Sequence, residues 1–165
     1  MPKLSKSMPL PVEGKSIVFN SSGVKLLLVL SEPVLADLTS FRLELLGYQV
    51  ETVASGNEAS ASISKSAPAL IIVDTMLADG DGLEWVARTR ADQSTSEIPV
   101  LIFSIDTSLE TVERAFHAGA QDYLISPFDP MVMEEKVERR LAVSLSSAGR
   151  KRPSAQRTTA QGATR

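Results

Sequence analysis

Four polar side chains each follow closely on an apolar run that is typical of a buried β-strand. They are Glu32, Asp74, Ser104 and Ser126. Two carboxylates that lie close together both ionise readily only when a cation sits between them, and hard oxygen ligands of this kind suit Mg²⁺. A serine hydroxyl beside them can donate to a phosphoryl oxygen. The arrangement therefore predicts a carboxylate that accepts phosphate from a donor, with Mg²⁺ as the neutralising charge.

Asp74 is the centre of this prediction. It ends the run Ala69–Val73, and the loop that follows, Thr75–Gly82, carries the acids Asp79 and Asp81 and two glycines. Open α/β sheets place their ligands at the carboxyl ends of the strands, where we expect this carboxylate to lie. The alternative is that Asp74 only begins a turn, as aspartates at strand ends often do.

The elements that would position these residues alternate along the chain. We expect strands at five runs: Leu26–Leu30, Tyr48–Val53, Ala69–Val73, Ile98–Phe103 and Tyr123–Ile125. A helix is expected after each strand, and the connections are short. This order predicts an α/β domain with a parallel sheet and helices on both faces, because parallel strands are joined by right-handed crossovers. The carboxyl ends of all five strands then meet at one edge.

Local signals indicate where the helices begin and end. Pro33 suits the first turn of the first helix, which carries apolar residues at helical spacing: Val34, Leu38, Phe41 and Leu45. Ser55 and Glu58 have the spacing of a capping box, and Thr107 and Glu110 repeat it. The last helix follows Asp129 and carries a second apolar stripe: Met133, Val137, Leu141 and Leu145.

Charge divides the 165 residues into three parts. Residues 1–23 carry a net charge of +2, residues 24–147 a net charge of −10, and residues 148–165 a net charge of +5. The last part is rich in Ser, Thr, Gln and Gly, a composition that buries too little apolar surface to fold. We therefore expect a flexible N-terminal segment over 1–23, one folded domain over 24–147 and a disordered basic tail over 148–165.

Composition also excludes several kinds of site. The chain has no cysteine and one histidine, so it holds neither a disulfide framework nor a metal site built from thiolates or imidazoles. No apolar run reaches the length of a membrane span, and the N-terminal segment lacks the apolar core of a secretory signal. We expect a soluble cytoplasmic protein that has no membrane partner.

Residues of about 25–146 resemble a CheY-like receiver domain of the bacterial two-component response regulators. The stretches that carry the resemblance are LLLVLSEP, LIIVDTMLADGDGLE, PVLIFS and GAQDYLISPF. The resemblance implies a flavodoxin-like, doubly wound five-stranded parallel sheet of order 2-1-3-4-5 with five helices. It also implies a cis peptide bond between Ser126 and Pro127.

The resemblance assigns roles to the residues at the sheet edge. It implies that Asp74 is the phosphoacceptor, and that Mg²⁺ is held by Glu32, Asp74 and the backbone carbonyl of Met76. It further implies that Ser104 is the switch hydroxyl and that Tyr123 is the aromatic side chain that moves inward on activation.

Three residues near the site depart from the family's usual sequence, and Ala78 of the Asp74 loop stands where the family usually has a proline. Ser31 stands where the family has the first of two acids, Ser126 stands where it has a lysine, and Ile105 stands where it has a small residue. The serine at 126 offers a neutral hydrogen bond about half as strong as a charge-assisted one. Because the missing acid and the missing lysine cancel in charge, Mg²⁺ can still balance the site, although we expect it to bind weakly. Ile105 would narrow the mouth over Asp74.

Two functions follow from these residues. The first is a stand-alone receiver-domain signalling protein of a phosphorelay, which takes phosphate on Asp74 from a histidine kinase or phosphotransfer protein and acts on a downstream protein target. The alternative is a pseudo-receiver, a fixed protein-interaction module that works without phosphorylation. An enzyme is not expected, because no nucleophile–base pair is evident, and the remaining residues are too few for a DNA-binding domain.

The contact surface for a partner or a homodimer is expected on the face made by the fourth helix, the fifth strand and the last helix. Mixed charges flank the apolar stripe there: Glu134, Glu135, Glu138, Arg139 and Arg140. An ordinary solvated helix face is the alternative interpretation.

Overall fold

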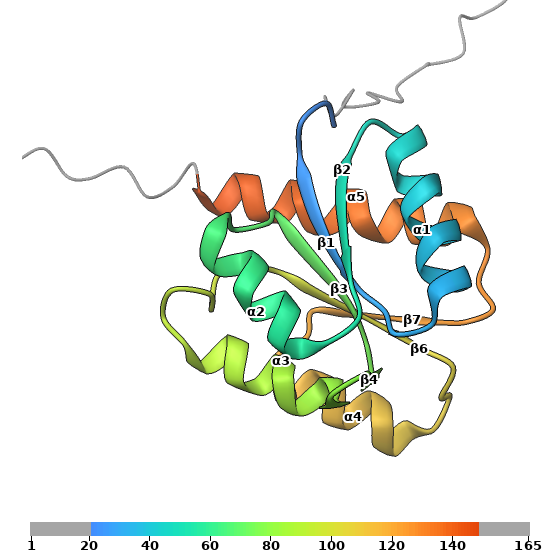
Figure 1. Ribbon diagram of the computed structural model, residues 1–165, viewed down its shortest axis with the longest axis vertical. Coiled ribbons are helices and arrows are strands. Elements are labelled where there is room, and N and C mark those ends of the chain that lie inside the picture. Colours follow the sequence, from blue (N-terminus) through green and yellow to red (C-terminus); the bar gives the residue numbers. More distant parts are fainter. Residues whose placement is uncertain (1–20, 149–165) are drawn as a thin grey trace, which may run out of the picture.

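A single parallel sheet forms the centre of the computed structural model, which describes residues 21–148 (Figure 1). Its strands are β1 (Lys25–Val29), β2 (Gln49–Val53), β3 (Leu70–Asp74), β6 (Val100–Ser104) and β7 (Asp122–Ile125). They lie in the order β2-β1-β3-β6-β7, and every neighbouring pair is parallel. The predicted order 2-1-3-4-5 is confirmed, with β6 and β7 as the fourth and fifth strands of the sheet.

The central strands are apolar throughout because the sheet is covered on both faces. Side chains alternate along each strand, so Leu27 and Val29 of β1 point to one face while Leu26 and Leu28 point to the other. All four are completely buried. This double burial explains why the strands were recognisable from the sequence as continuous apolar runs.

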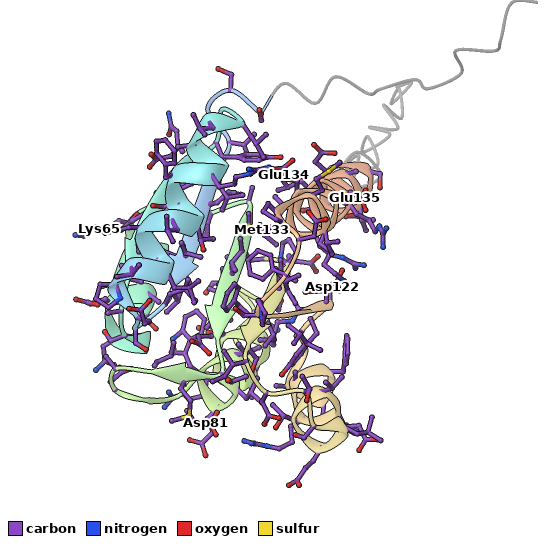
Figure 2. The ribbon with its side chains drawn as sticks, turned by 90° about the vertical axis from the view of Figure 1, so that its right-hand side faces the viewer. Lys65, Asp81, Asp122, Met133, Glu134 and Glu135 are labelled. Carbon is purple, nitrogen blue, oxygen red and sulfur yellow. The ribbon has the colours of Figure 1, made fainter. Side chains whose placement is uncertain are left out.

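Five helices cover the two faces: α1 (Pro33–Leu45), α2 (Gly56–Lys65), α3 (Gly82–Ala91), α4 (Leu109–Ala118) and α5 (Pro130–Ala148). Helices α1 and α5 pack on one face, where Leu43 and Met133 join the core. Figure 2 shows Met133 on the inner side of α5. Helices α2, α3 and α4 pack on the other face, where Trp85 is buried. The strands that end at the functional edge therefore lie in a sheet that helices cover on both faces.

The helix signals read from the sequence are confirmed at α1, which Pro33 begins, and at α2, and they are wrong at α4. Ser55 and Glu58 form the predicted capping box of α2. Gly119 ends α4 with a φ of 107°, a left-handed conformation that glycine adopts without strain. The predicted cap at Thr107 is wrong, because Ser108 caps α4 by accepting the Thr111 N–H at 3.3 Å.

Asp106 explains this one-residue difference. Its Oδ1 accepts the Ser108 N–H at 2.8 Å, and its Oδ2 accepts the Thr111 hydroxyl at 2.6 Å. The carboxylate thus holds the turn before α4 and moves the first helical residue to Leu109. The capping-box pattern does not include position 106, so it could not predict this turn.

The loop after β3 folds back tightly against the strand end. It contains a two-residue hairpin of β4 (Met76–Leu77) and β5 (Gly80–Asp81), which the sequence did not predict. Gly82 donates its N–H to the Thr75 carbonyl at 2.9 Å. A Cβ at position 82 would lie 1.9 Å from the Asp74 carbonyl oxygen, so only glycine fits there. This close return positions the loop beside the Asp74 side chain.

Several sequence-based expectations concern chain segments at the ends. The flexible segment 1–23 and the basic tail 148–165 lie outside the described residues, apart from residues 21–23 and Ala148. The Leu145 side chain is likewise not described, whereas Met133, Val137 and Leu141 are buried as expected. The Ser126–Pro127 bond is cis, as the resemblance implied. Between residues 21 and 148, no helix is both long and apolar enough to cross a membrane.

Candidate functional site

Asp74 lies at the carboxyl end of β3, half-buried at the predicted edge of the sheet. Its Oδ1 accepts hydrogen bonds from the Thr75 hydroxyl and the Met76 N–H, both at 3.3 Å. Burial raises the pKa of Asp74 above its ordinary value, and the donors on Met76 and Thr75 only partly oppose it. The structure thus presents a carboxylate that is held in place and is more basic than an exposed one.

Ser104 is connected to Asp74 through Thr75. The Ser104 side chain is fully buried at the end of β6, and its hydroxyl lies 3.1 Å from the Thr75 hydroxyl. Because the Thr75 proton is donated to Asp74, Ser104 is the donor to Thr75. The predicted switch hydroxyl and the predicted phosphoacceptor are thereby linked through one intermediate residue that sequence reasoning missed.

Tyr123 is turned into the protein on β7. Its side chain is buried, and its hydroxyl donates to the Asp106 carbonyl at 2.9 Å. The Asp106 N–H in turn donates to the Ser104 hydroxyl at 3.0 Å. Burial raises the pKa of Tyr123, and the charges of Asp106 and Asp74 add to this effect. The Tyr123 side chain is therefore buried in this structure, and its role as the switch aromatic stays a prediction.

Glu32 lies at the end of β1, but its carboxylate faces the start of α1. One oxygen accepts the Val34 N–H at 3.2 Å and the other accepts the Leu35 N–H at 2.6 Å. This is N-cap geometry, which satisfies helix donors that have no partner within the helix. Glu32 is thus already bound by α1 as a capping residue.

Ser31 contacts the backbone group that was expected to bind the metal ion. Its hydroxyl donates to the Met76 carbonyl at 3.2 Å. A carbonyl oxygen has two lone pairs, so this bond occupies one of them and leaves the other for a ligand. The serine that replaces the usual acid therefore also holds the loop after Asp74.

These residues fit a weakly held Mg²⁺ ion. Mg²⁺ takes oxygen ligands, keeps several waters and needs only one or two carboxylates. Asp74 at the end of β3 and the carbonyl of Met76, two residues later, would supply two oxygens. No three His, Asp or Glu side chains converge on a metal position within the part of the chain that the structure describes. Glu32 can join the site only by releasing the N–H groups of α1.

The two other departures lie at the rim. Ser126 is partly exposed after β7, and its N–H donates to the Ser104 carbonyl at 2.8 Å. Ile105 directs its side chain to solvent, since 80% of it is exposed. It therefore does not pack over Asp74, in contrast to the narrowing expected from the sequence.

The two further acids of the loop are structural. Asp79 accepts the N–H groups of Gly56 and Asn57 at 2.8 and 3.0 Å, which fastens the hairpin to the start of α2. Asp81 caps α3 and pairs with Arg114 of α4 at 2.9 Å. Figure 2 shows Asp81 at the end of the molecule where the hairpin lies. Each carboxylate ties the Asp74 loop to a neighbouring helix.

Comparison with known proteins identifies the family of this chain. The model of the response regulator receiver domain matches residues 26–138, more than half of the chain. The chain belongs to this family. Receiver domains are signalling domains of two-component systems, and they bind Mg²⁺ in the active site.

Relatives of this receiver domain include both longer regulators and single domains. The DNA-binding dual master transcriptional regulator RpaA of Synechocystis sp. is 34% identical over 117 residues, which are 71% of this chain and 48% of RpaA. The chain thus spans about half the length of RpaA. The chemotaxis response regulator CheY4 of Vibrio cholerae has a TM-score of 0.67 at 29% identity, over 72% of this chain and 99% of that one.

A third relative concerns the metal. The receiver domain of the sensor histidine kinase PA1611 from Pseudomonas aeruginosa has a TM-score of 0.68 at 27% identity, over 73% of this chain and 99% of that one. Its structure is described with a magnesium ion coordinated in the active-site cleft. The fold expected from the sequence is confirmed, whereas the roles assigned to Glu32, Asp74, Met76, Ser104, Tyr123 and Ser126 stay predictions.

Proposed function

We propose that this receiver domain accepts a phosphoryl group on Asp74 from a histidine kinase or a phosphotransfer protein, and passes the signal on through protein–protein contacts. The observation that carries the proposal is the continuous set of hydrogen bonds from Asp74 through Thr75 and Ser104 to Asp106 and Tyr123. A change at the carboxylate is thereby connected to β6, β7 and the turn before α4.

In the proposed transfer, an Asp74 carboxylate oxygen forms a bond to phosphorus while the bond between phosphorus and the donor's leaving atom breaks. Bound Mg²⁺ would supply positive charge for the phosphoryl oxygens. Asp74 and the Met76 carbonyl would hold it. The Thr75 hydroxyl contacts the carboxylate and the Ser104 hydroxyl contacts Thr75, so either one can donate to a phosphoryl oxygen once its present bond is released.

The pseudo-receiver remains a second candidate, and three observations favour it. The Tyr123 side chain is already buried, and Glu32 is engaged by α1. Position 126 holds a hydroxyl where a lysine would provide a cation for the phosphoryl group. We therefore expect phosphorylation to be slow and to change the conformation little, because the active arrangement gains little binding energy over the resting one.

The proposed partner or homodimer surface consists of α4, β7 and α5. Exposed apolar side chains occur on all three elements: Leu109, Phe116, Ile125, Met131 and Val132. Glu134 and Arg140, named as surface charges from the sequence, are engaged elsewhere, with Arg42 at 2.7 Å and with Asp122 at 3.4 Å. Figure 2 shows Glu134 between α5 and α1. Glu135, Glu138 and Arg139 remain as the exposed charges of this surface.

The decisive experiment is a titration of the full chain with Mg²⁺ and then with beryllofluoride or a small phosphodonor, with Asp74→Asn as the control. Weak Mg²⁺ binding and slow, stoichiometric phosphorylation that the control lacks would support the switch. If neither Mg²⁺ nor beryllofluoride perturbs the protein at millimolar concentration, the pseudo-receiver is the correct function. That this chain acts as a stand-alone protein stays a prediction from the sequence.

A further inference from the structure

Helix α1 carries a line of large apolar side chains on its solvent-facing side. Val34, Leu38, Phe41 and Leu45 are 61–68% exposed. The opposite side of the helix packs on the sheet through smaller residues and one leucine: Ala36, Thr39 and Leu43. Single exposed apolar residues are common, but a contiguous patch of this kind marks a surface that another element covers. We call these four residues the α1 stripe.

The α1 stripe has the spacing of a coiled-coil seam. Its steps along the chain are four, three and four residues, so Val34 and Phe41 are one heptad apart, as are Leu38 and Leu45. Helices with this repeat pack side by side along their length, at a small crossing angle. The surface therefore fits a second helix with the same repeat, better than it fits a flat or irregular partner.

We propose that a second copy of this chain covers the α1 stripe, so that two α1 helices pair in parallel about a two-fold axis. Each copy supplies the same apolar seam, which a two-fold interface requires. In both views α1 lies at the outside of the molecule (Figure 1, Figure 2). Pairing through its outer side leaves the two sheets and the two Asp74 edges apart.

The charges beside the α1 stripe select the parallel orientation. At 3.6 residues per turn, Asp37 and Glu44 lie on one flank of the stripe and Arg42 lies on the other. In a parallel pair unlike flanks face each other, and Asp37 precedes Arg42 by the five residues that bring it opposite Arg42 of the second copy. In an antiparallel pair like flanks meet, which would place Asp37 against Glu44 of the second copy.

Both charged groups are available for this contact. Asp37 makes no ion pair among the described residues. Arg42 donates from Nε to Glu134 at 2.7 Å, and its guanidinium has further N–H donors for a second carboxylate. The intramolecular bond to Glu134 also fixes the Arg42 side chain beside the stripe.

The expected dimer is weak and depends on concentration. Helix α1 has 13 residues, less than two full heptads. The interface therefore falls below the roughly 1,200 Å² of total buried surface that specific stable complexes reach. It involves other elements than the α4, β7 and α5 surface and needs no phosphorylation of Asp74, so it stands or fails independently of the proposed function.

Sedimentation velocity on the full chain over a concentration series tests the proposal. We expect a reversible monomer–dimer equilibrium that Leu38→Glu abolishes, while the control Ala61→Glu, which adds the same charge at an exposed position on α2, leaves it unchanged. A wild-type chain that is monomeric at every concentration overturns the proposal. A dimer that survives Leu38→Glu, or that Leu109→Glu on α4 removes instead, overturns it as well. Phe41→Glu replaces Leu38→Glu if circular dichroism shows that the latter is unfolded.

A charge exchange tests the orientation. Asp37→Arg and Arg42→Asp should each weaken the dimer about tenfold or less, and the double variant should restore it, because the exchanged pair again faces its opposite charge. An antiparallel dimer would respond differently, since Asp37→Arg alone would remove a repulsion and strengthen it. That result would overturn the parallel arrangement.

Discussion

At the scale of the residue, Glu32 is needed at two places. Its carboxylate caps α1 through the N–H groups of Val34 and Leu35, and the family resemblance requires the same group at the metal ion. A carboxylate is also electrostatically favoured at a helix N-terminus. The two roles compete, so metal binding at Asp74 must draw Glu32 away from the helix or proceed without it.

Glu32→Gln separates these roles. The amide keeps an acceptor for the N–H groups of α1 but removes the negative charge with which Glu32 would attract Mg²⁺. We expect the free energy of unfolding to fall by about 1 kcal/mol or less, and Mg²⁺ affinity, measured by calorimetry, to fall severalfold. Unchanged Mg²⁺ affinity would show that Glu32 only caps α1. Glu32→Ala is the matched control that loses both the cap and the ligand.

Asp74→Asn should raise stability at neutral pH. Burial holds the pKa of Asp74 above its unfolded value, so its ionisation destabilises the folded state. Below the pKa that Asp74 has in the unfolded chain, the carboxyl is protonated in both states and the folded protein keeps its full stability. That stability is lost as the pH rises through the higher pKa that Asp74 has in the folded protein. We expect the variant's melting temperature to exceed that of the wild type by a few degrees at pH 7, and the difference to shrink as the pH is lowered toward 4.

Asp92→Asn is the control, because we expect it to change stability at neutral pH in the opposite direction. Hydrogen bonds from the Ser94 hydroxyl and N–H lower the pKa of Asp92. Its variant should therefore lose stability at neutral pH and show no such loss in acid. A gain of stability in both variants would mean that removal of net negative charge, rather than burial at position 74, causes the effect.

At the scale of the element, Asp122 fastens α5 to the sheet. It begins β7 with only 9% exposure, and its carboxylate contacts Lys136 at 2.6 Å and Arg140 at 3.4 Å. Figure 2 shows Asp122 below α5. Burial opposes its ionisation, but the Lys136 hydrogen bond, the Tyr123 N–H and the two cations outweigh burial and lower the pKa of Asp122.

Asp122→Asn should destabilise the domain by about 1–3 kcal/mol at pH 7, because two cations then lose their shared carboxylate. Because the pKa of Asp122 is lower in the folded protein, this stabilisation is present above the pKa that Asp122 has in the unfolded chain. It is lost as the pH falls through the pKa that Asp122 has in the folded protein. Urea unfolding at pH 7 and in acid measures both effects. Glu135→Gln, an exposed position on α5, is the control. Equal stability of Asp122→Asn and wild type would show that Asp122 does not hold α5.

The elements also show what could be predicted from the sequence. Double burial made the strands recognisable, and proline and capping signals located the starts of α1 and α2. The apolar residues that revealed α1 are nevertheless its exposed ones, because periodicity identifies a stripe without showing which side meets the sheet. The small residues Ala36 and Thr39 occupy the buried side. The sequence did not predict the hydrogen bonds of Thr75, Asp79 and Ser31. Each of these residues contacts a partner that is brought near only by folding.

At the scale of the whole molecule, the protein has two exposed apolar surfaces: the α1 stripe, and the apolar side chains of α4, β7 and α5. The second is connected to Asp74 by hydrogen bonds through Thr75, Ser104, Asp106 and Tyr123. Phosphorylation should therefore act on the α4 side. The size of its effect depends on how strongly the phosphoryl group is held.

Ser126→Lys tests what limits that effect. A lysine ammonium at the end of β7 would make a charge-assisted bond to the phosphoryl group, about twice as strong as the neutral bond a serine offers. Because a ligand shifts a conformational equilibrium only by its differential affinity, the added bond should increase the change in α4. Hydrogen–deuterium exchange of α4, with and without beryllofluoride and Mg²⁺, measures that change. Ser126→Met is the control for side-chain length without charge. An equal response in all three proteins would show that Tyr123, already buried, leaves no movement for phosphorylation to drive.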